Sequence, residues 1–221
     1  MSLFVTSTDT GVGKTHTIVQ LLRLLRRDGI PCAGLKPICC GDRNDAEQIL
    51  AASDSGLMID EVNPVWLKAP LAPLVAARIE NVNIDIDQIF AAFASLRSRV
   101  QLVIVEGVGG WLVPIRADYL VSDLAAQMKL PVLVVVMNRL GCLNHALLTV
   151  RSVKERGLSC VGIALNEIPA ASDLATATNA DVLPELVDLP ILPALNEQMS
   201  ELPPVWRQTL AVTSLARLFR L

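Results

Sequence analysis

The sequence predicts an α/β fold in which a mostly parallel sheet is covered by helices on both faces. Short runs rich in Val, Ile and Leu alternate with stretches whose apolar residues recur with helical periodicity. The runs are nearly continuous in apolar character, which is typical of strands buried on both faces. Hydrophobic residues make up 52% of the 221 residues and charged residues 19%. A chain of this length and composition can bury a full core without disulfides or structural metals. We therefore expect residues 1–221 to form a single α/β domain.

The expected elements follow one another in regular alternation. Strands are predicted at Leu3–Thr6, Cys32–Lys36, Gln101–Glu106, Val132–Asn138, Cys160–Asn166 and, more weakly, Val187–Leu192. Helices are predicted at Thr15–Arg27, Ala46–Ala52, Asp87–Leu96, Leu143–Arg156 and Asp173–Leu183. The stretch from Asp60 to Pro73 contains prolines and is expected to be a loop with little regular structure. The tail from Pro203 to Leu221 is expected to end in a helix.

Composition excludes several classes of function. The net charge is 19 − 22 = −3 and only eight residues are aromatic (Trp 3, Tyr 1, Phe 4), so neither a basic face nor stacking rings favour nucleic acid. The five cysteines are odd in number and lack metal-site spacing. The N-terminus does not resemble a signal peptide, and the longest apolar run, Leu130–Met137, is far below the ~18 residues of a spanning helix. We expect a reduced, cytoplasmic protein that binds neither nucleic acid nor membrane.

Polar residues close the predicted strands. They are Thr6, Lys36, Glu106, Asn138 and Asn166. In parallel α/β sheets ligands bind beyond the carboxyl ends of the strands, so these side chains should collect on one edge, where they could bind an anion and a metal together. The alternative is that polar residues simply terminate strands.

The strongest motif is TSTDTGVGKT, from Thr6 to Thr15, between the first strand and the first helix. Its end, G-K-T, is typical of a P-loop, in which backbone N–H groups and the helix N-terminus surround a phosphate. Lys14 would reach the β- and γ-phosphates and the Thr15 hydroxyl would bind Mg²⁺. The strict pattern fails because Thr8 stands where its first glycine belongs. The alternative is a glycine-containing strand–helix turn.

Two further residues extend this hypothesis. Glu106 ends an apolar strand and precedes Gly107, Gly109 and Gly110, a position typical of a Walker-B metal ligand. It could also be a solvated strand-terminal carboxylate. Lys36 precedes Pro37, which fixes the backbone after it. Lys36 is either a counter-ion of the phosphate site or a solvated strand end.

Together, several motifs resemble dethiobiotin synthetase in order and spacing over nearly the whole chain. They are TSTDTGVGKT, GLKPICCGDRNDA, VEGVGGWLVPI, PVLVVVMNRLGCLNHALLT, LNEI and LPALNEQ. The resemblance implies a homodimeric P-loop enzyme of biotin biosynthesis. It would convert 7,8-diaminononanoate, CO2 and MgATP into dethiobiotin, ADP and phosphate, through a carbamate and a carbamic–phosphoric anhydride.

The resemblance also implies roles for individual residues. Lys14 and Lys36 would neutralise carbamate and phosphate charge, and Thr10 would touch the substrate. The nucleotide would contact Thr10, Gly11, Val12, Gly13, Lys14, Thr15, Asn166, Pro193 and Glu197. Mg²⁺ would be held by Thr15, Asp45 and Glu106, with Asp42 as an alternative to Asp45.

The same resemblance implies a substrate site shared between two subunits. The substrate would contact Lys36, Cys40, Gly109 and Gly110 of one chain and Gly141, Cys142, Leu143 and Asn144 of the partner. The latter segment opens a predicted helix, whose N-terminus favours a carboxylate. Asn144 could instead be only a helix cap.

The sequence departs from the family at two positions. Ser7 stands where glycine is usual, so the entry to the loop must form without a positive φ. Cys40 stands where a serine commonly contacts the substrate region, and a thiol is a weaker hydrogen-bond partner than a hydroxyl.

Two other functions compete with this interpretation. Partitioning or positioning ATPases share the P-loop superfamily, but their loop carries an extra lysine where this chain has Asp9. They also need a basic or amphipathic surface, which is not evident here. An amidotransferase of the cobalamin-biosynthesis type would need a glutaminase domain, for which 221 residues leave no room.

Overall fold

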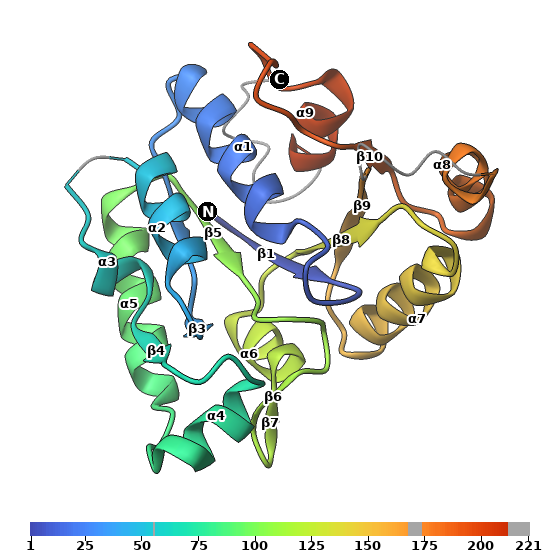
Figure 1. The fold of residues 1–221 in the computed structure, drawn as a ribbon. Coiled ribbons are helices and arrows are strands. Elements are labelled where there is room, and N and C mark those ends of the chain that lie inside the picture. Colours follow the sequence, from blue (N-terminus) through green and yellow to red (C-terminus); the bar gives the residue numbers. More distant parts are fainter. Residues whose placement is uncertain (55, 168–173, 212–221) are drawn as a thin grey trace.

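The computed structural model describes residues 1–54, 56–167 and 174–211 and is built on a six-stranded parallel sheet (Figure 1). The strand order is β10-β9-β8-β1-β5-β2. The bounds are β1 Ser2–Ser7, β2 Cys32–Leu35, β5 Leu102–Glu106, β8 Val132–Met137, β9 Cys160–Asn166 and β10 Ile191–Pro193. Every pairing in this sheet is parallel, so all carboxyl ends lie at one edge.

Helices cover both faces of the sheet, as the sequence predicted. Within β1, Leu3 and Val5 face one apolar cluster while Phe4 faces the other. The first cluster is completed by α1 (Lys14–Arg27), α2 (Asn44–Ala52) and α9 (Pro204–Ala211). The second is completed by α5 (Ile86–Arg99), α6 (Val121–Met128), α7 (Cys142–Glu155) and α8 (Leu174–Leu186). The continuous apolar strands are therefore explained by burial on both sides.

Five of the six predicted strands are confirmed to within one residue at either end. The sixth, predicted at Val187–Leu192, is wrong in extent, because β10 covers only Ile191–Pro193. The Val187 N–H donates to the Leu183 carbonyl, which makes this residue the end of α8 and not the start of a strand.

The loop predicted from Asp60 to Pro73 is also wrong. This region contains α3 (Ile59–Val62) and β4 (Val65–Leu67), and α4 (Pro73–Glu80) begins at its end. Strand β4 pairs in parallel with β3 (Ile38–Cys40), which is far away in sequence. The Asn63 side chain stabilises this arrangement by donating to the carbonyls of Lys36 and Val65. Three-residue strands depend on such long-range pairing and carry no periodicity of their own.

Three further elements were not predicted: a hairpin of β6 (Pro114–Arg116) and β7 (Tyr119–Leu120), and helix α6. A signal for α6 was present, because Val121, Leu124, Ala125 and Met128 recur with helical spacing and are buried. Of the helix predicted in the C-terminal tail, α9 is described and residues 212–221 lie outside the described part, as does Asp173. None of the described helices combines the length and apolarity needed to cross a membrane.

Candidate active site

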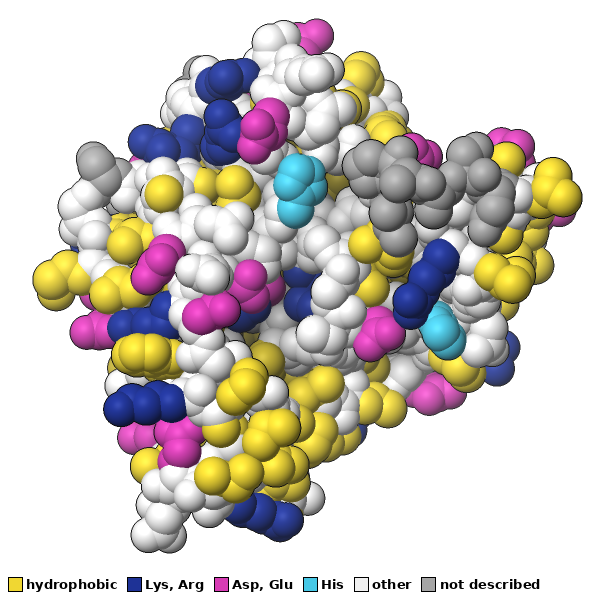
Figure 2. Space-filling model, viewed as in Figure 1, with side chains coloured by type: hydrophobic (Ala, Val, Ile, Leu, Met, Phe, Trp, Pro, Cys, Tyr) yellow, Lys and Arg dark blue, Asp and Glu magenta, His cyan; other side chains and the backbone are white. Residues whose placement is uncertain are grey.

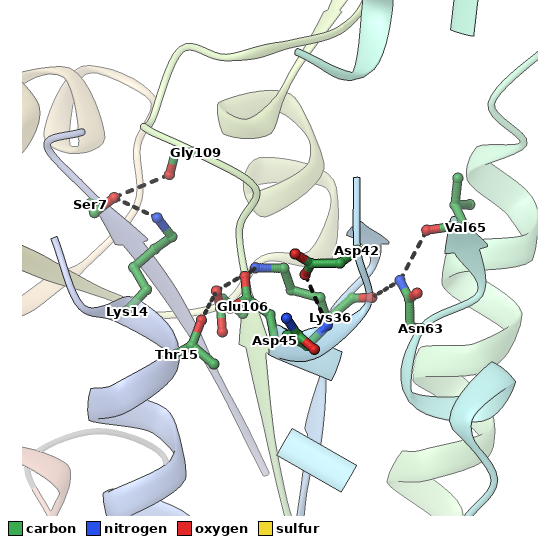
Figure 3. A network of polar contacts seen from close by, with 11 residues as sticks. Ser7, Lys14, Thr15, Lys36, Asp42, Asp45, Asn63, Val65, Glu106 and Gly109 are labelled. Carbon is green, nitrogen blue, oxygen red and sulfur yellow. Dashed lines mark hydrogen bonds and ion pairs between the residues drawn. The ribbon is translucent and has the colours of Figure 1, made fainter. Parts of the chain in front are cut away.

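At the carboxyl edge of the sheet, polar groups from three strands and two helices meet (Figure 3). Lys36, just after β2, lies 2.7 Å from Asp45 Oδ2 of α2 and 2.5 Å from Glu106 Oε1 at the end of β5. The Thr15 hydroxyl of α1 donates to the same Glu106 oxygen at 2.9 Å. Asn138, also expected here, instead donates to the Thr176 carbonyl and accepts from Asn179, so it anchors α8.

The phosphate loop depends on glycines and on one asparagine. Gly11 and Gly13 have φ values of 75° and 89°, which favour glycine. A Cβ on Gly13 would lie 2.5 Å from the Asn166 side-chain nitrogen. That amide donates to the carbonyls of Val12 at 2.9 Å and Gly13 at 3.2 Å. Asn166 therefore holds the loop from the end of β9.

Lys14 is held by Ser7 at the entry to this loop. Its Nζ donates to Ser7 Oγ at 3.0 Å, and Ser7 Oγ lies 2.7 Å from the Asp9 carbonyl and 3.1 Å from that of Gly109. Burial lowers the pKa of Lys14 to about 8, against the influence of Glu106. Ser7 is absent from the described residues with positive φ, so the serine enters the loop without backbone strain.

Lys36 is a buried cation held by two carboxylates, with 4% of its surface exposed. Burial alone would lower its pKa, but Glu106 and Asp45 outweigh burial and keep the pKa above its usual value. Burial would likewise raise the pKa of Asp45, yet Lys36 holds it below the usual range. The ammonium and the Asp45 carboxylate therefore both stay charged at neutral pH.

The site has a donor set that fits a small hard cation. Glu106 is 1% exposed, and its Oε2 has no hydrogen-bond partner within the described structure. Thr15 and Asp45 add a hydroxyl and a second carboxylate beside it. The described residues hold no cluster of three His, Cys, Asp or Glu. Mg²⁺ is usually bound through one or two carboxylates, with waters and substrate phosphates completing its shell.

Asp42 has a different contact from Asp45. It lines the same cavity, but its Oδ1 accepts from the backbone N–H of Asn44 at 3.1 Å, at the start of α2. The geometry therefore favours Asp45 as the residue that reaches a cation, in agreement with the preference drawn from the sequence.

These groups line a cavity of about 670 Å³, a size that suits a substrate. Its charged wall is formed by Lys14, Lys36, Asp42, Asp45 and Glu106. Its other wall includes Thr10, Cys40, Pro70, Leu71, Val108, Gly109 and Val113. Figure 2 shows this face hollowed near its centre, with basic atoms recessed in the hollow and acidic side chains beside it. A larger aliphatic cavity, of about 910 Å³, is lined by residues such as Leu130, Cys160 and Pro190 at the amino ends of β8, β9 and β10, and holds none of these charged groups.

The glycines after β5 divide between two hollows. Gly109 lines the charged cavity, and a Cβ there would lie 2.8 Å from Val113 Cγ2. Gly110 lines a neighbouring cavity of about 450 Å³ with Trp111, Leu112 and His145.

The segment Gly141–Asn144 lies outside the charged cavity of its own chain. Gly141, in the left-handed region, precedes α7, so Asn144 lies within the helix and the alternative reading of Asn144 as its cap is wrong. Cys142 is 2% exposed and faces the core, which leaves only its backbone for a ligand. Asn144 is exposed, and first-turn N–H groups of a helix have no intrahelical partner.

The last two predicted residues, Pro193 and Glu197, lie at the end of β10 and in the segment that follows it. Pro193 ends that strand and is exposed. The Glu197 side chain is 75% exposed and lies 4.0 Å from Arg23 of α1.

Sequence reasoning missed the roles of Asn63, His16 and Asn179. His16 Nε2 lies 2.8 Å from the Leu195 carbonyl, and Asn179 contacts Asn138. The sequence shows that Ser7 is unusual for the family, but it carries no sign of the contact between Ser7 and Lys14. Nothing local in the sequence indicates the partners of Asn63 or His16.

The thiols of this protein are expected to be inert at neutral pH. All five cysteines are free, and Cys40 alone among them is partly exposed. Burial raises the pKa of Cys40 to about 11, which lowers its thiolate fraction about a hundredfold or more relative to an ordinary cysteine. Iodoacetamide should therefore label the native protein slowly at pH 7.5, and about tenfold faster for each pH unit up to 9.5. Rapid labelling of Cys40 at pH 7.5, located by mass spectrometry, would contradict this expectation.

A parallel sheet, a glycine loop around a buried lysine between β1 and α1, and an acid at the end of β5 define a P-loop nucleotide-binding protein. Residues 1–199 match the family model described as "AAA domain". The MinD septum site-determining protein of Pyrococcus horikoshii, in complex with Mg-ADP, shares this fold at a TM-score of 0.52 and 14% identity, over 87% of this chain and 82% of that one.

The curated relatives specify the family further. The "ATP-dependent dethiobiotin synthetase BioD" of Akkermansia muciniphila is 47% identical over 86% of this chain and 90% of the relative. The protein of the same name from Aromatoleum aromaticum is 44% identical over 86% of this chain and 87% of the relative. The chain belongs to the dethiobiotin synthetase family.

Proposed function

We propose that this protein is an ATP-dependent dethiobiotin synthetase, which carboxylates 7,8-diaminononanoate with CO2 and closes the ring to give dethiobiotin, ADP and phosphate. The observation that carries the proposal is the pair of buried lysines, Lys14 and Lys36, at the mouth of the phosphate loop. The cavity offers charge and backbone amides but no nucleophilic triad among its described lining residues. Such a site suits phosphoryl transfer, which requires mainly positioning and charge neutralisation.

The mechanism follows from where charge develops. One substrate amine, captured by CO2 as a carbamate, attacks the γ-phosphate, and the second amine then closes the ring and expels phosphate. Lys36 is kept charged by Asp45 and Glu106 and would stabilise the carbamate and the anhydride oxygens. Lys14 would leave Ser7 to reach the β- and γ-phosphates. The glycine at 109 and Thr10 would leave room for the diamine beside these charges.

Thr15, Asp45 and Glu106 would hold Mg²⁺ in this proposal. The cation, when bound, neutralises phosphate charge. The buried Oε2 of Glu106, which has no hydrogen-bond partner among the described residues, supports the assignment.

We expect Glu106→Gln to weaken Mg²⁺-dependent nucleotide binding about ten- to a hundredfold, because the amide removes the charge that faces the cation. Isothermal titration of ADP at varied Mg²⁺ measures this effect without turnover. Asp45→Asn should act in the same direction. Asp42→Asn is the matched control, because the Asp42 carboxylate accepts from the backbone N–H of Asn44 at the start of α2 and should leave the Mg²⁺ dependence unchanged. An unchanged Mg²⁺ dependence in Glu106→Gln would contradict the assignment.

A homodimer with shared sites is part of the proposal. The exposed α7 N-terminus lies outside the cavity of its own chain, so the substrate carboxylate would be received by the Gly141–Asn144 turn of a second copy. Leu112, Leu140 and Leu148 are 55%, 82% and 57% exposed and would add apolar surface to such an interface. Leu112 and Leu148 line one hollow with Trp111 and with His145, which directly follows Asn144 in the chain.

The deciding experiment is a mass-spectrometric search for dethiobiotin after incubation with MgATP, bicarbonate and the diamine. Omission of each component is the control, and a product that depends on all three supports the proposal. The competing function, a nucleotide-gated switch, predicts ATP turnover that ignores the diamine and rises with DNA or lipid. In the loop position where such switches carry a lysine, Asp9 pairs with Arg139 at 3.1 Å, which favours the synthetase over the switch.

We also propose a cytoplasmic location, where ATP is available and the five free thiols would stay reduced.

A further inference from the structure

The segment after β10 is attached to α1 by side chains that the proposed mechanism does not use. His16 Nε2 lies 2.8 Å from the Leu195 carbonyl, and the Arg27 guanidinium donates to the Met199 carbonyl at 2.9 Å. Trp206 of α9 donates from Nε1 to the Pro193 carbonyl at 3.0 Å. We call residues 193–199 the β10 loop. Three of its carbonyls are thus held by side chains from the two helices beside it.

The geometry assigns a defined proton to His16. A carbonyl oxygen can only accept a hydrogen bond, so Nε2 carries the hydrogen that is donated to Leu195. Leu195 itself is 1% exposed, and its side chain packs in the cluster beneath α1. The side chain of Leu195 and the carbonyl of Leu195 are therefore both fixed, one by packing and the other by His16.

The contact between His16 and Leu195 connects the phosphate-binding end of α1 to the β10 loop. His16 follows Lys14 and Thr15 in the first turn of α1, so it is rigidly connected to the groups that face the phosphates. The β10 loop leaves the sheet at the carboxyl edge, where Pro193 pairs with Leu165 of β9 and Asn166 reaches the phosphate loop. A nucleotide whose phosphates lie on the phosphate loop would place its nucleoside between the phosphate loop and the β10 loop.

We propose that His16 is a positioning residue of the nucleotide site, which sets the β10 loop at the distance from the phosphate loop that the nucleoside part of ATP requires. It does so through the Leu195 carbonyl and does not contact the reacting atoms. The inference rests on the proposed function in one respect, the assignment of the β10 loop to adenosine. It concerns binding of the nucleoside and leaves the phosphoryl transfer unchanged.

The test compares two probes that share the phosphate part. Isothermal titration measures binding of MgATP and of magnesium tripolyphosphate, which has no nucleoside, to wild type and to His16→Ala. We expect the Kd for MgATP to rise about five- to tenfold, as for loss of one hydrogen bond, and that for tripolyphosphate to change less than twofold. In steady-state assays the KM for ATP should rise while kcat stays within twofold.

A pair of amide variants checks that the hydrogen bond is responsible. The Gln amide nitrogen can occupy the place of His Nε2, whereas the Asn amide is one methylene too short. His16→Gln should therefore restore MgATP binding to within about twofold of wild type, and His16→Asn should behave like His16→Ala. If His16→Ala fails to fold, the comparison of His16→Gln with His16→Asn still tests whether this hydrogen bond supports MgATP binding.

Three results would overturn the inference: equal weakening of both probes, which would mean that His16 contacts phosphate; unchanged MgATP binding in His16→Ala; or no difference between Gln and Asn. These binding results are independent of the reaction catalysed. If wild type forms no dethiobiotin but shows the expected pattern, the proposed function fails and the role of His16 stands.

Discussion

Replacing Lys36 by alanine should lower the rate of dethiobiotin formation by about a hundred- to a thousandfold at saturating substrates. The lysine is 4% exposed and lies within 2.7 Å of two carboxylates, so its charge is fixed in place before substrate binds. Its removal would leave the developing negative charge of the carbamate and the anhydride without a partner. Single-turnover measurement of product by mass spectrometry checks this expectation.

Stability needs a separate control in this experiment. Lys36→Ala should still fold but with reduced stability, because it leaves Glu106 as a buried charge that has lost its cation. The double variant Lys36→Ala, Glu106→Gln removes that unpaired charge and should recover part of the lost melting temperature without recovering activity. Near-normal turnover in a folded Lys36→Ala protein would show that the lysine has no part in the reaction.

The second large effect is recovery of activity when two inactive variants are mixed. Lys36→Ala damages one half of a shared site, and Asn144→Asp damages the other by setting like charge against the substrate carboxylate. In a mixed dimer one site carries both defects and the other carries neither. With free exchange about half the dimers are mixed, so about a quarter of all sites are intact and activity should approach a quarter of wild type.

The time course distinguishes this recovery from simple addition. Activity should rise after a lag set by subunit exchange, whereas residual activities of the two variants would add at once. Asn144→Asp should fold normally, because Asn144 is exposed in the first turn of α7, where a negative charge favours the helix. If native mass spectrometry shows mixed dimers and activity stays low, the site is not shared in the proposed way.

Much of the sheet could be predicted from local pattern alone. A strand such as Val132–Met137 is apolar at nearly every position because helices bury both of its faces. That pattern is local, so it can be recognised in the sequence without knowledge of the tertiary structure. The pairing of Ile38 with Val65 has no such signature, because each strand is three residues long and its partner is remote in sequence. Helix α6 falls between these cases, since its buried apolar residues recur with helical spacing in the sequence although no helix was predicted there.

The candidate site divides in the same way. The phosphate loop is contiguous, so its glycines, Lys14 and Thr15 could be identified from the sequence together with the helix that follows. That Lys36 and Glu106 would meet could be anticipated only as a rule about the carboxyl edges of parallel strands. The 2.5 Å contact between them, across 70 positions of sequence, was decided by the adjacency of β2 and β5.

The sequence by itself determined the alternation of strands and helices, the phosphate loop and the family to which the chain belongs. Only the tertiary structure decided that Ser7 holds Lys14, that Asp42 accepts from the Asn44 backbone while Asp45 faces Lys36, and that His16 reaches Leu195. The physical reason is that backbone periodicity is a local property of neighbouring residues. A hydrogen bond between side chains instead depends on ångström-scale distances that arise only when separate elements have packed against one another.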